Sequence, residues 1–123
     1  MQWKFRGRGR NGTKQAGTPN KTETAYMAIL DERKRAGEIV EWWFERFTFT
    51  LSHSRPNVAG QRYTPDFAVM LSDGEIEFHE VKGFMDEKNM NKLKMAGELF
   101  PFRFRLVMKR TKKDGGGWQI TEY

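Results

Sequence analysis

Residues 63–83, which read YTPDFAVMLSDGEIEFHEVKG, contain two runs of strand-forming residues separated by Ser72-Asp73-Gly74. Such a short connection between two strand-like runs predicts an antiparallel hairpin. If Gly74 takes the left-handed conformation that three-residue hairpin loops favour, Leu71 pairs with Glu75. This hairpin constrains the whole chain, because a sheet built on it has to bury at least one face.

The second strand of the hairpin carries charged side chains at the end of an apolar face. Side chains of like parity share a face of a strand, so Ile76 and Phe78 mark an inward face that ends in Glu80 and Lys82. Burying charge there is costly unless something compensates it. A metal ion or a bound phosphate would do so.

The register of the hairpin brings a third charged group to the same place. With Leu71 opposite Glu75, Asp66 falls directly opposite Glu80, and two carboxylates converge with the ammonium group of Lys82. A two-residue Asp-Gly turn would instead shift the register by one residue and turn Asp66 to the other face.

A helix is predicted to begin after Asn20, because Asn20 and Glu23 have the spacing of a capping box, and to end at Gly37. Glu23 lies above the apolar stripe that this helix turns toward the sheet, formed by Tyr26, Met27 and Leu30. Spacing alone supports equally a capping role for Glu23 and a role as a fourth charged group of the site.

The remaining segments predict an α/β domain. The order is helix, three strands, helix, strand (αβββαβ), which predicts a central mixed sheet of four to five strands flanked by helices. After the first helix we expect one strand, straight or bent, over residues 39–51, a polar loop over 52–62, the hairpin, a helix over roughly 86–100, a strand over 102–108 and an optional strand at the end of the chain. Residues 18–123 then form a single domain.

The net charge of +6 lies entirely in residues 1–21, which hold six basic residues and no acid. Residues 88–113 form a second basic region, with nine Lys and Arg against Glu98 alone. A polyanion such as DNA suits these regions, although a solubilising tail and a solvated helix face are the alternatives. We expect residues 1–17 to form a flexible basic arm, and DNA contacts at Arg6, Arg8, Arg10, Lys14, Lys88 and Lys92.

Other site chemistries find little support. The chain has no cysteine, which excludes thiolate zinc sites, and no apolar run approaches the ~20 residues of a membrane span. We therefore expect a cytoplasmic protein. His53 and His79 lack the pattern of a His-Asn-His metal finger, and His79 is expected on the outer face of its strand. The aromatic residues of 39–51 favour core packing over base stacking.

Pro65-Asp66, followed after fourteen positions by Glu80-Val81-Lys82 and preceded by a helix with Glu23, resembles the PD-(D/E)XK nuclease motif. The similarity is closest to the phage endonuclease I family of Holliday-junction resolvases, over roughly residues 20–108. The chain differs from that family in its longer hairpin, its Arg-Gly arm and its short C-terminus. The amino-terminal endonuclease subunits of some transposases share the same pattern.

The resemblance implies a restriction-endonuclease-like core and a metal-dependent endonuclease that hydrolyses phosphodiester bonds in branched DNA. It implies one or two Mg²⁺ or Mn²⁺ ions, whose ligands are Asp66, Glu80 and the carbonyl of Val81, with Glu23 completing the site. Lys82 would orient or deprotonate the attacking water, so the catalytic residues are Glu23, Asp66, Glu80 and Lys82.

The resemblance also implies a setting and an assembly. A phage or prophage protein would act in the cytoplasm of a bacterial host cell. A junction has two equivalent strands to cut, so we expect a homodimer, with residues 39–51 as a source of its interface. The alternatives are a nicking, restriction-like or transposase-type nuclease on linear duplex, and a non-catalytic basic DNA-binding module.

Overall fold

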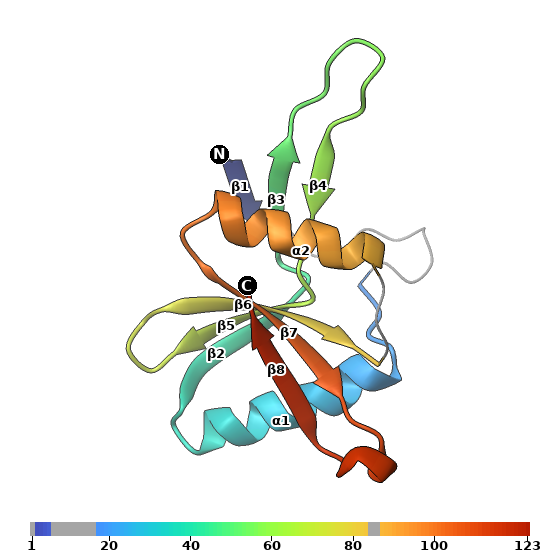
Figure 1. The fold of residues 1–123 in the computed structure, drawn as a ribbon. Helices are drawn as coiled ribbons and strands as arrows, with labels where there is room; N and C mark the ends of the chain where they lie inside the picture. The colour runs from blue at the N-terminus through green and yellow to red at the C-terminus, as the bar shows by residue number, and fades with distance from the viewer. Residues whose placement is uncertain (1, 6–16, 84–86) are drawn as a thin grey trace.

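The computed structural model describes residues 2–5, 17–83 and 87–123. Two helices and eight strands follow one another through these ranges (Figure 1). Their order is β1 (Gln2–Phe5), α1 (Lys21–Arg35), β2 (Ile39–Phe44), β3 (Phe47–Ser52), β4 (Gln61–Tyr63), β5 (Phe67–Leu71), β6 (Ile76–Lys82), α2 (Glu87–Leu99), β7 (Arg103–Lys109), the 3₁₀ turn η1 (Lys112–Asp114) and β8 (Trp118–Glu122).

The central sheet has five strands in the order β2-β5-β6-β7-β8. The neighbours β6 and β7 run parallel and every other pair in this sheet is antiparallel. The parallel pair is joined by α2, which is the long crossover that parallel strands require. The expected class, an α/β fold with a mixed sheet and flanking helices, is therefore confirmed.

The prediction of one strand over residues 39–51 is wrong, because β2 and β3 belong to different sheets. Between them Glu45 takes a left-handed conformation, with φ of 48°, and its N–H donates to the carbonyl of Asp66 at 2.8 Å. This turn redirects the chain into a second, three-stranded sheet of order β1-β3-β4. In the expected arm, Gln2–Phe5 thus form an edge strand, and residues 6–16 lie outside the described ranges.

The segment expected as a polar loop forms the projecting end of a hairpin between β3 and β4 (Figure 1). Arg55 and Val58 close its tip by donating their N–H groups to each other's carbonyls, at 2.9 and 3.0 Å. At its base, Gly60 leaves no room for a side chain, since an added Cβ would lie 2.7 Å from the carbonyl oxygen of Ser52. The hairpin leads directly into Tyr63 and the Pro-Asp segment.

The register predicted for the β5–β6 hairpin is confirmed. Gly74 has φ of 92°, and the N–H of Leu71 donates to the carbonyl of Glu75 at 2.8 Å. Phe67 pairs with His79 and Met70 with Ile76, so Asp66, one residue before β5, faces Glu80. The capping box of Asn20 and Glu23 and the left-handed Gly37 after α1 are confirmed as well.

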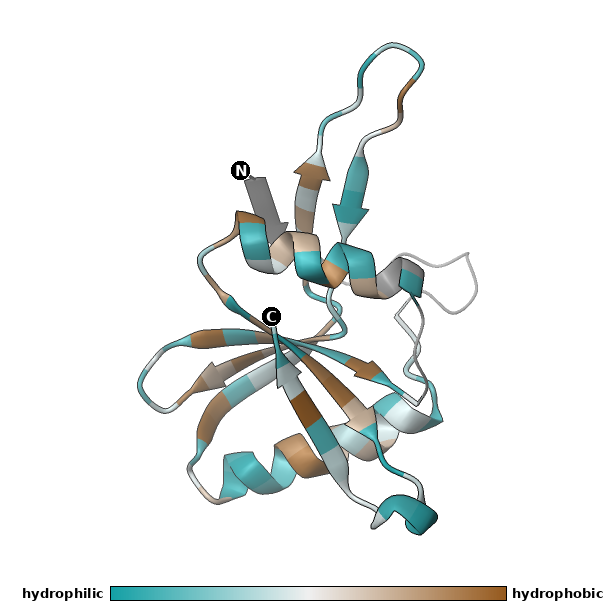
Figure 2. Ribbon diagram, in the orientation of Figure 1, coloured by the Kyte–Doolittle hydropathy of each residue, from teal (hydrophilic) through white to brown (hydrophobic). Residues whose placement is uncertain are grey.

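Both faces of the central sheet are buried, whereas the pleat of β6 had suggested a single inward face. Figure 2 shows the apolar residues concentrated on the central strands between the two helices. The cluster under α2 includes Phe49, Phe78, Leu93 and Phe104, and the cluster under α1 includes Tyr26, Leu30, Phe67, Val81 and Val107. Parallel strands flanked by helices are commonly buried on both faces, which an alternating pattern does not reveal.

Neither helix in the described ranges is long and apolar enough to cross a membrane.

Candidate active site

Asp66 and Glu80 lie side by side at the carboxyl end of β6, with exposed fractions of 9% and 5%. The Oδ2 atom of Asp66 accepts a hydrogen bond of 2.8 Å from the N–H of Val81. The Oε1 atom of Glu80 accepts one of 2.7 Å from the hydroxyl of Tyr63. Each carboxylate is therefore held by a partner from a neighbouring segment, and its orientation is set before any ligand arrives.

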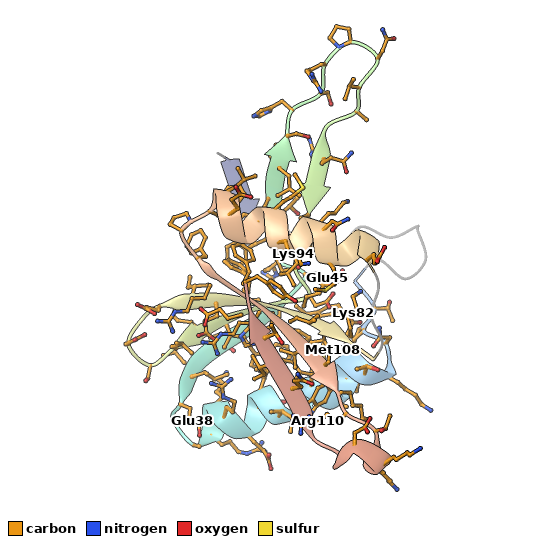
Figure 3. The ribbon with its side chains drawn as sticks, viewed as in Figure 1. Glu38, Glu45, Lys82, Lys94, Met108 and Arg110 are labelled. Carbon is orange, nitrogen blue, oxygen red and sulfur yellow. The ribbon has the colours of Figure 1, made fainter. Side chains whose placement is uncertain are left out.

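Lys82 follows two residues later on the same face of β6, at the end of the strand (Figure 3). Its Nζ atom lies 3.2 Å from Oε2 of Glu80, and its side chain is 22% exposed. The tyrosine and the lysine thus bind different oxygens of one carboxylate. This leaves the ammonium group at the mouth of the site, where a phosphate could reach it.

The capping role of Glu23 is confirmed. Its Oε1 atom accepts from the N–H of Asn20 at 2.9 Å, and its own N–H donates to Oδ1 of Asn20 at 2.8 Å. The side chain is nevertheless 8% exposed, and its charge and hydrogen bonding help to raise the pKa of Asp66. The carboxylate of Glu23, which caps the first turn of α1, therefore lies near Asp66.

The carboxyl groups are crowded enough to oppose one another's ionisation. Burial, followed by the charge of Glu80, raises the pKa of Asp66 to about 9. Burial also raises the pKa of Glu80, although the Tyr63 hydrogen bond and the Lys82 charge act in the opposite direction. Asp66 therefore retains a proton at neutral pH unless a cation takes its place.

Asp66, Glu80 and the carbonyl of Val81 are hard oxygen donors of the type that Mg²⁺ and Mn²⁺ prefer. In the described part of the chain, no group of three or more His, Cys, Asp or Glu side chains is arranged so that it could hold a metal ion, so the carboxylate ligands here would be Asp66 and Glu80. Mg²⁺ commonly uses one or two carboxylates and fills its other positions with water and substrate phosphate. The donor set fits such an open site.

Of the residues expected to contact DNA, the structure describes the side chain of Lys92 alone. Lys92 donates from Nζ to the carbonyl of Arg62 at 3.0 Å and so links α2 to β4. The side chain of Lys88 lies outside the described part, as do Arg6, Arg8, Arg10 and Lys14. His53 is exposed in the projecting hairpin.

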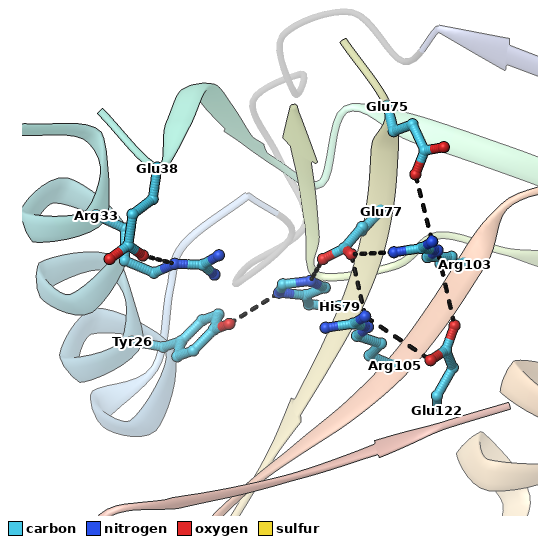
Figure 4. Close-up of polar contacts among 9 residues, drawn as sticks. All are labelled: Tyr26, Arg33, Glu38, Glu75, Glu77, His79, Arg103, Arg105 and Glu122. Carbon is cyan, nitrogen blue, oxygen red and sulfur yellow. Dashed lines mark hydrogen bonds and ion pairs between the residues drawn. The ribbon is translucent and has the colours of Figure 1, made fainter. Parts of the chain in front are cut away.

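His79 corrects the expectation of an outer-face residue, because it is 1% exposed beneath α1. Its Nδ1 atom lies 2.8 Å from the hydroxyl of Tyr26, and its Nε2 atom lies 3.0 Å from Oε1 of Glu77 (Figure 4). Glu77 also pairs with Arg103 and Arg105. Burial lowers the pKa of His79, which favours the neutral ring. The network occupies the opposite face of β6 from Glu80.

Sequence reasoning missed Tyr63 as a site residue. Tyr63 stands three residues before Asp66, and its side chain is 5% exposed. Burial and the charge of Glu80 raise its pKa, so the hydroxyl stays protonated and donates to that carboxylate. The alternation of a strand over residues 61–63 was the available signal, but three residues are too few to distinguish a strand from a loop.

Comparisons with protein-family models, curated proteins and solved structures gave no match for this chain.

Proposed function

We propose that the chain is a metal-dependent endonuclease that hydrolyses phosphodiester bonds in DNA. The observation that carries this proposal is the pairing of two buried carboxylates, Asp66 and Glu80, with Lys82 at the carboxyl end of β6. Burial raises the pKa of both carboxyl groups, and the charge of Glu80 raises that of Asp66 further, so the pair makes a site for a divalent cation, and the adjacent ammonium group makes a site for a phosphate.

The residues that would hold Mg²⁺ or Mn²⁺ are Asp66, Glu80 and the carbonyl of Val81, and Glu23, whose charge raises the pKa of Asp66, would contribute through water. A divalent ion at such a site lowers the pKa of a bound water and offsets negative charge on the phosphate.

The chain's own residues supply positioning and charge. The N–H of Val81 holds Oδ2 of Asp66, and the hydroxyl of Tyr63 holds Oε1 of Glu80, so both carboxylates have a set orientation. Lys82 lies at the mouth of the site, where its ammonium group orients the attacking water and stabilises the charge that develops on the phosphate. Glu23 adds negative charge from α1, which increases the affinity of the site for a cation.

The substrate that we propose first is branched DNA, on the strength of the similarity to the phage endonuclease I family. The restriction-endonuclease-like core belongs to the same proposal. The two buried faces, the α1 carboxylate and the hairpin that carries the acidic pair are consistent with that architecture.

The test is cleavage of a four-way junction and of a linear duplex with the same sequence, each with Mg²⁺ and with a chelator. We expect metal-dependent cleavage of the junction, and a rate that is about 10²–10³-fold lower in Asp66→Asn and in Glu80→Gln. Glu32→Gln, an exposed change on α1, is the matched control and should cut normally. Metal-dependent cutting of the duplex alone would favour a nicking or restriction-like nuclease. Full activity of either site variant would refute the site.

A further inference from the structure

A hollow of about 490 Å³ opens beside the candidate active site, at the carboxyl ends of the parallel strands β6 and β7. Ligands of open α/β sheets bind preferentially beyond the carboxyl ends of parallel strands. The hollow is lined by Gly83, Met108, Lys109, Arg110, Thr111, Asp114 and Gln119.

The hollow is continuous with the site. Gly83 directly follows Lys82, and Lys82 pairs in register with Met108 on β7 (Figure 3). A Cβ atom added to Gly83 would lie 3.6 Å from Oγ1 of Thr22, in the first turn of α1. That turn also carries Glu23. A DNA strand with one phosphate at Lys82 would therefore bring a neighbouring phosphate to the hollow.

The charge of the hollow is predominantly positive. Lys109 and Arg110 are exposed, and Lys112 and Lys113 follow on η1. Within the described ranges none of these four side chains forms an ion pair. The opposing charge comes from Asp114, whose Oδ2 atom accepts a hydrogen bond of 3.0 Å from the hydroxyl of Thr111.

The backbone around these cations is well anchored. The N–H of Arg110 donates to the carbonyl of Gly117 at 2.8 Å, and the N–H of Gly116 donates to the carbonyl of Thr111 at 2.8 Å. Gly115, Gly116 and Gly117 have φ of 99°, 67° and 74°. Residues with a Cβ atom would strain the backbone in this left-handed conformation. The tight turn therefore presents Lys109 and Arg110 from a set position.

We propose that this hollow binds a phosphate of the DNA backbone next to the phosphodiester that is cut at Asp66 and Glu80. The inference rests on the proposed function and deepens it, because it assigns the position of the strand beyond the cut. A guanidinium group matches a phosphate with two parallel hydrogen bonds, and a lysine adds a point charge. Gripping the neighbouring phosphate would hold the scissile bond in place against Lys82.

The first test is DNA binding as a function of salt, measured with Arg110→Ala and Lys109→Ala in an Asp66→Asn background in which cutting is slowed. We expect each change to weaken DNA binding by up to about tenfold. The slope of log affinity against log salt concentration should become shallower by about 0.9 for each phosphate that the variant no longer neutralises. Arg35→Ala is the matched control, since Arg35 is exposed thirteen residues beyond Thr22 on α1, about 20 Å away. An unchanged slope in both hollow variants, or an equal reduction in the control, would overturn the proposal.

Asp114→Asn provides a test in the opposite direction. The amide oxygen can still accept from Thr111, while the negative charge that opposes a phosphate is removed. Binding should tighten several-fold and more than in Glu32→Gln, which removes a remote carboxylate as the matched control. Equal or weaker binding than in that control would contradict a phosphate in the hollow.

The cleavage assay and a titration with inorganic phosphate distinguish failure of the hollow proposal from failure of the proposed nuclease function. If the protein cuts DNA but hollow variants bind and cut as the parent does, the hollow proposal fails and the nuclease stands. If no substrate is cut while hollow variants bind DNA more weakly with a smaller salt slope, the hollow stands as a site for a backbone phosphate and the nuclease fails. If inorganic phosphate shifts the amide signals of Gly83 and Arg110 but the variants leave DNA affinity unchanged, the hollow is a small-anion site and the backbone proposal is overturned.

Discussion

Asp66 is the residue on which the electrostatics of the site depend. It is buried, faces Glu80 and has one carboxylate oxygen held by the N–H of Val81. Burial and the charge of Glu80 raise its pKa to about 9, so the metal-free protein retains a proton that the unfolded chain releases near pH 4. Folding and proton binding are therefore coupled at this position.

The sign of this coupling gives the first prediction. Between pH 7 and 9 the native state binds more protons than the unfolded state, so the metal-free protein should lose stability as pH rises. The limit is about 1.4 kcal/mol per pH unit for one proton. The free energy of unfolding, measured by urea denaturation in chelator at pH 7, 8 and 9, should fall in the parent and change less in Asp66→Asn. Saturating Mg²⁺ should stabilise the parent most at pH 9, and a parent whose stability rises over this range would contradict the raised pKa.

Tyr63 is a positioning residue, and Tyr63→Phe removes only its hydrogen bond to Glu80. Partners of this kind around a metal site are typically worth 10–100-fold in metal affinity or activity, so we expect the Mg²⁺ concentration for half-maximal cleavage to rise by about tenfold or more. Tyr26→Phe is the matched control, because it removes a buried hydroxyl that contacts His79 on the opposite face. A metal dependence that shifts equally in both variants would exclude the positioning role.

At the scale of elements, β6 serves two purposes through its two faces. One face ends in Glu80 and Lys82, and the other carries Glu77 and His79 against α1 and β7. Glu77 is 2% exposed, and burial raises its pKa while the hydrogen bond of His79 and the charges of Arg105 and Arg103 lower it to a net pKa below the usual value. The ion pairs of Glu77 thus fasten β6 to β7 underneath the site.

This arrangement predicts different costs for two carboxylates that bind the same arginine. Glu77→Gln removes the buried partner of Arg105 and should reduce the free energy of unfolding by about 3 kcal/mol. Glu122→Gln removes an exposed partner and should cost less than about 1 kcal/mol. Urea denaturation at pH 7 measures both. Equal costs would mean that the network contributes little beyond surface pairing.

At the scale of the whole molecule, the basic arm can be tested without disturbing the fold. Because β1 pairs with β3, deleting residues 1–17 would remove an edge strand along with the charges. Changing Arg6, Arg8, Arg10 and Lys14 to Gln retains β1. If all four contact phosphates, the salt slope of DNA binding should fall by about 3.6. A slope equal to that of the parent would identify the arm as a passive tail.

Assembly is the second whole-molecule prediction. Paired cutting of a junction needs two sites, and this chain has one candidate site in its described ranges, so sedimentation at micromolar concentration should give a mass near twice 14.5 kDa. In the folded chain Ile39, Phe49 and Leu51 are buried, but Val40 is 52% exposed and Trp42 and Trp43 are half-buried, so residues 39–51 keep apolar surface that an interface could cover. A strict monomer that still cuts branched DNA would exclude paired-site resolution.

Local patterns were sufficient for much of the fold. The capping box of Asn20 and Glu23, Gly37 after α1 and the Ser72-Asp73-Gly74 loop were all predictable from neighbouring residues, because each depends on backbone conformations within a few positions. The same short-range logic set the β5–β6 register and so placed Asp66 opposite Glu80. The acidic pair of the candidate site was therefore predictable from the sequence.

Long-range contacts decided the rest. Glu45 breaks the aromatic segment into two strands because its N–H bonds to Asp66, twenty-one residues away. His79 is buried because α1 covers that face, and Tyr63 reaches Glu80 because β4 pairs with β3. No periodicity records such contacts, since each joins segments whose distance in space depends on the packing of the whole chain. The sequence by itself determined which charged residues the β5–β6 hairpin brings together. Only the tertiary structure decided that Tyr63 bonds to Glu80, that Glu23 lies near Asp66 and that a basic hollow adjoins Lys82, because these neighbours come from other segments of the chain.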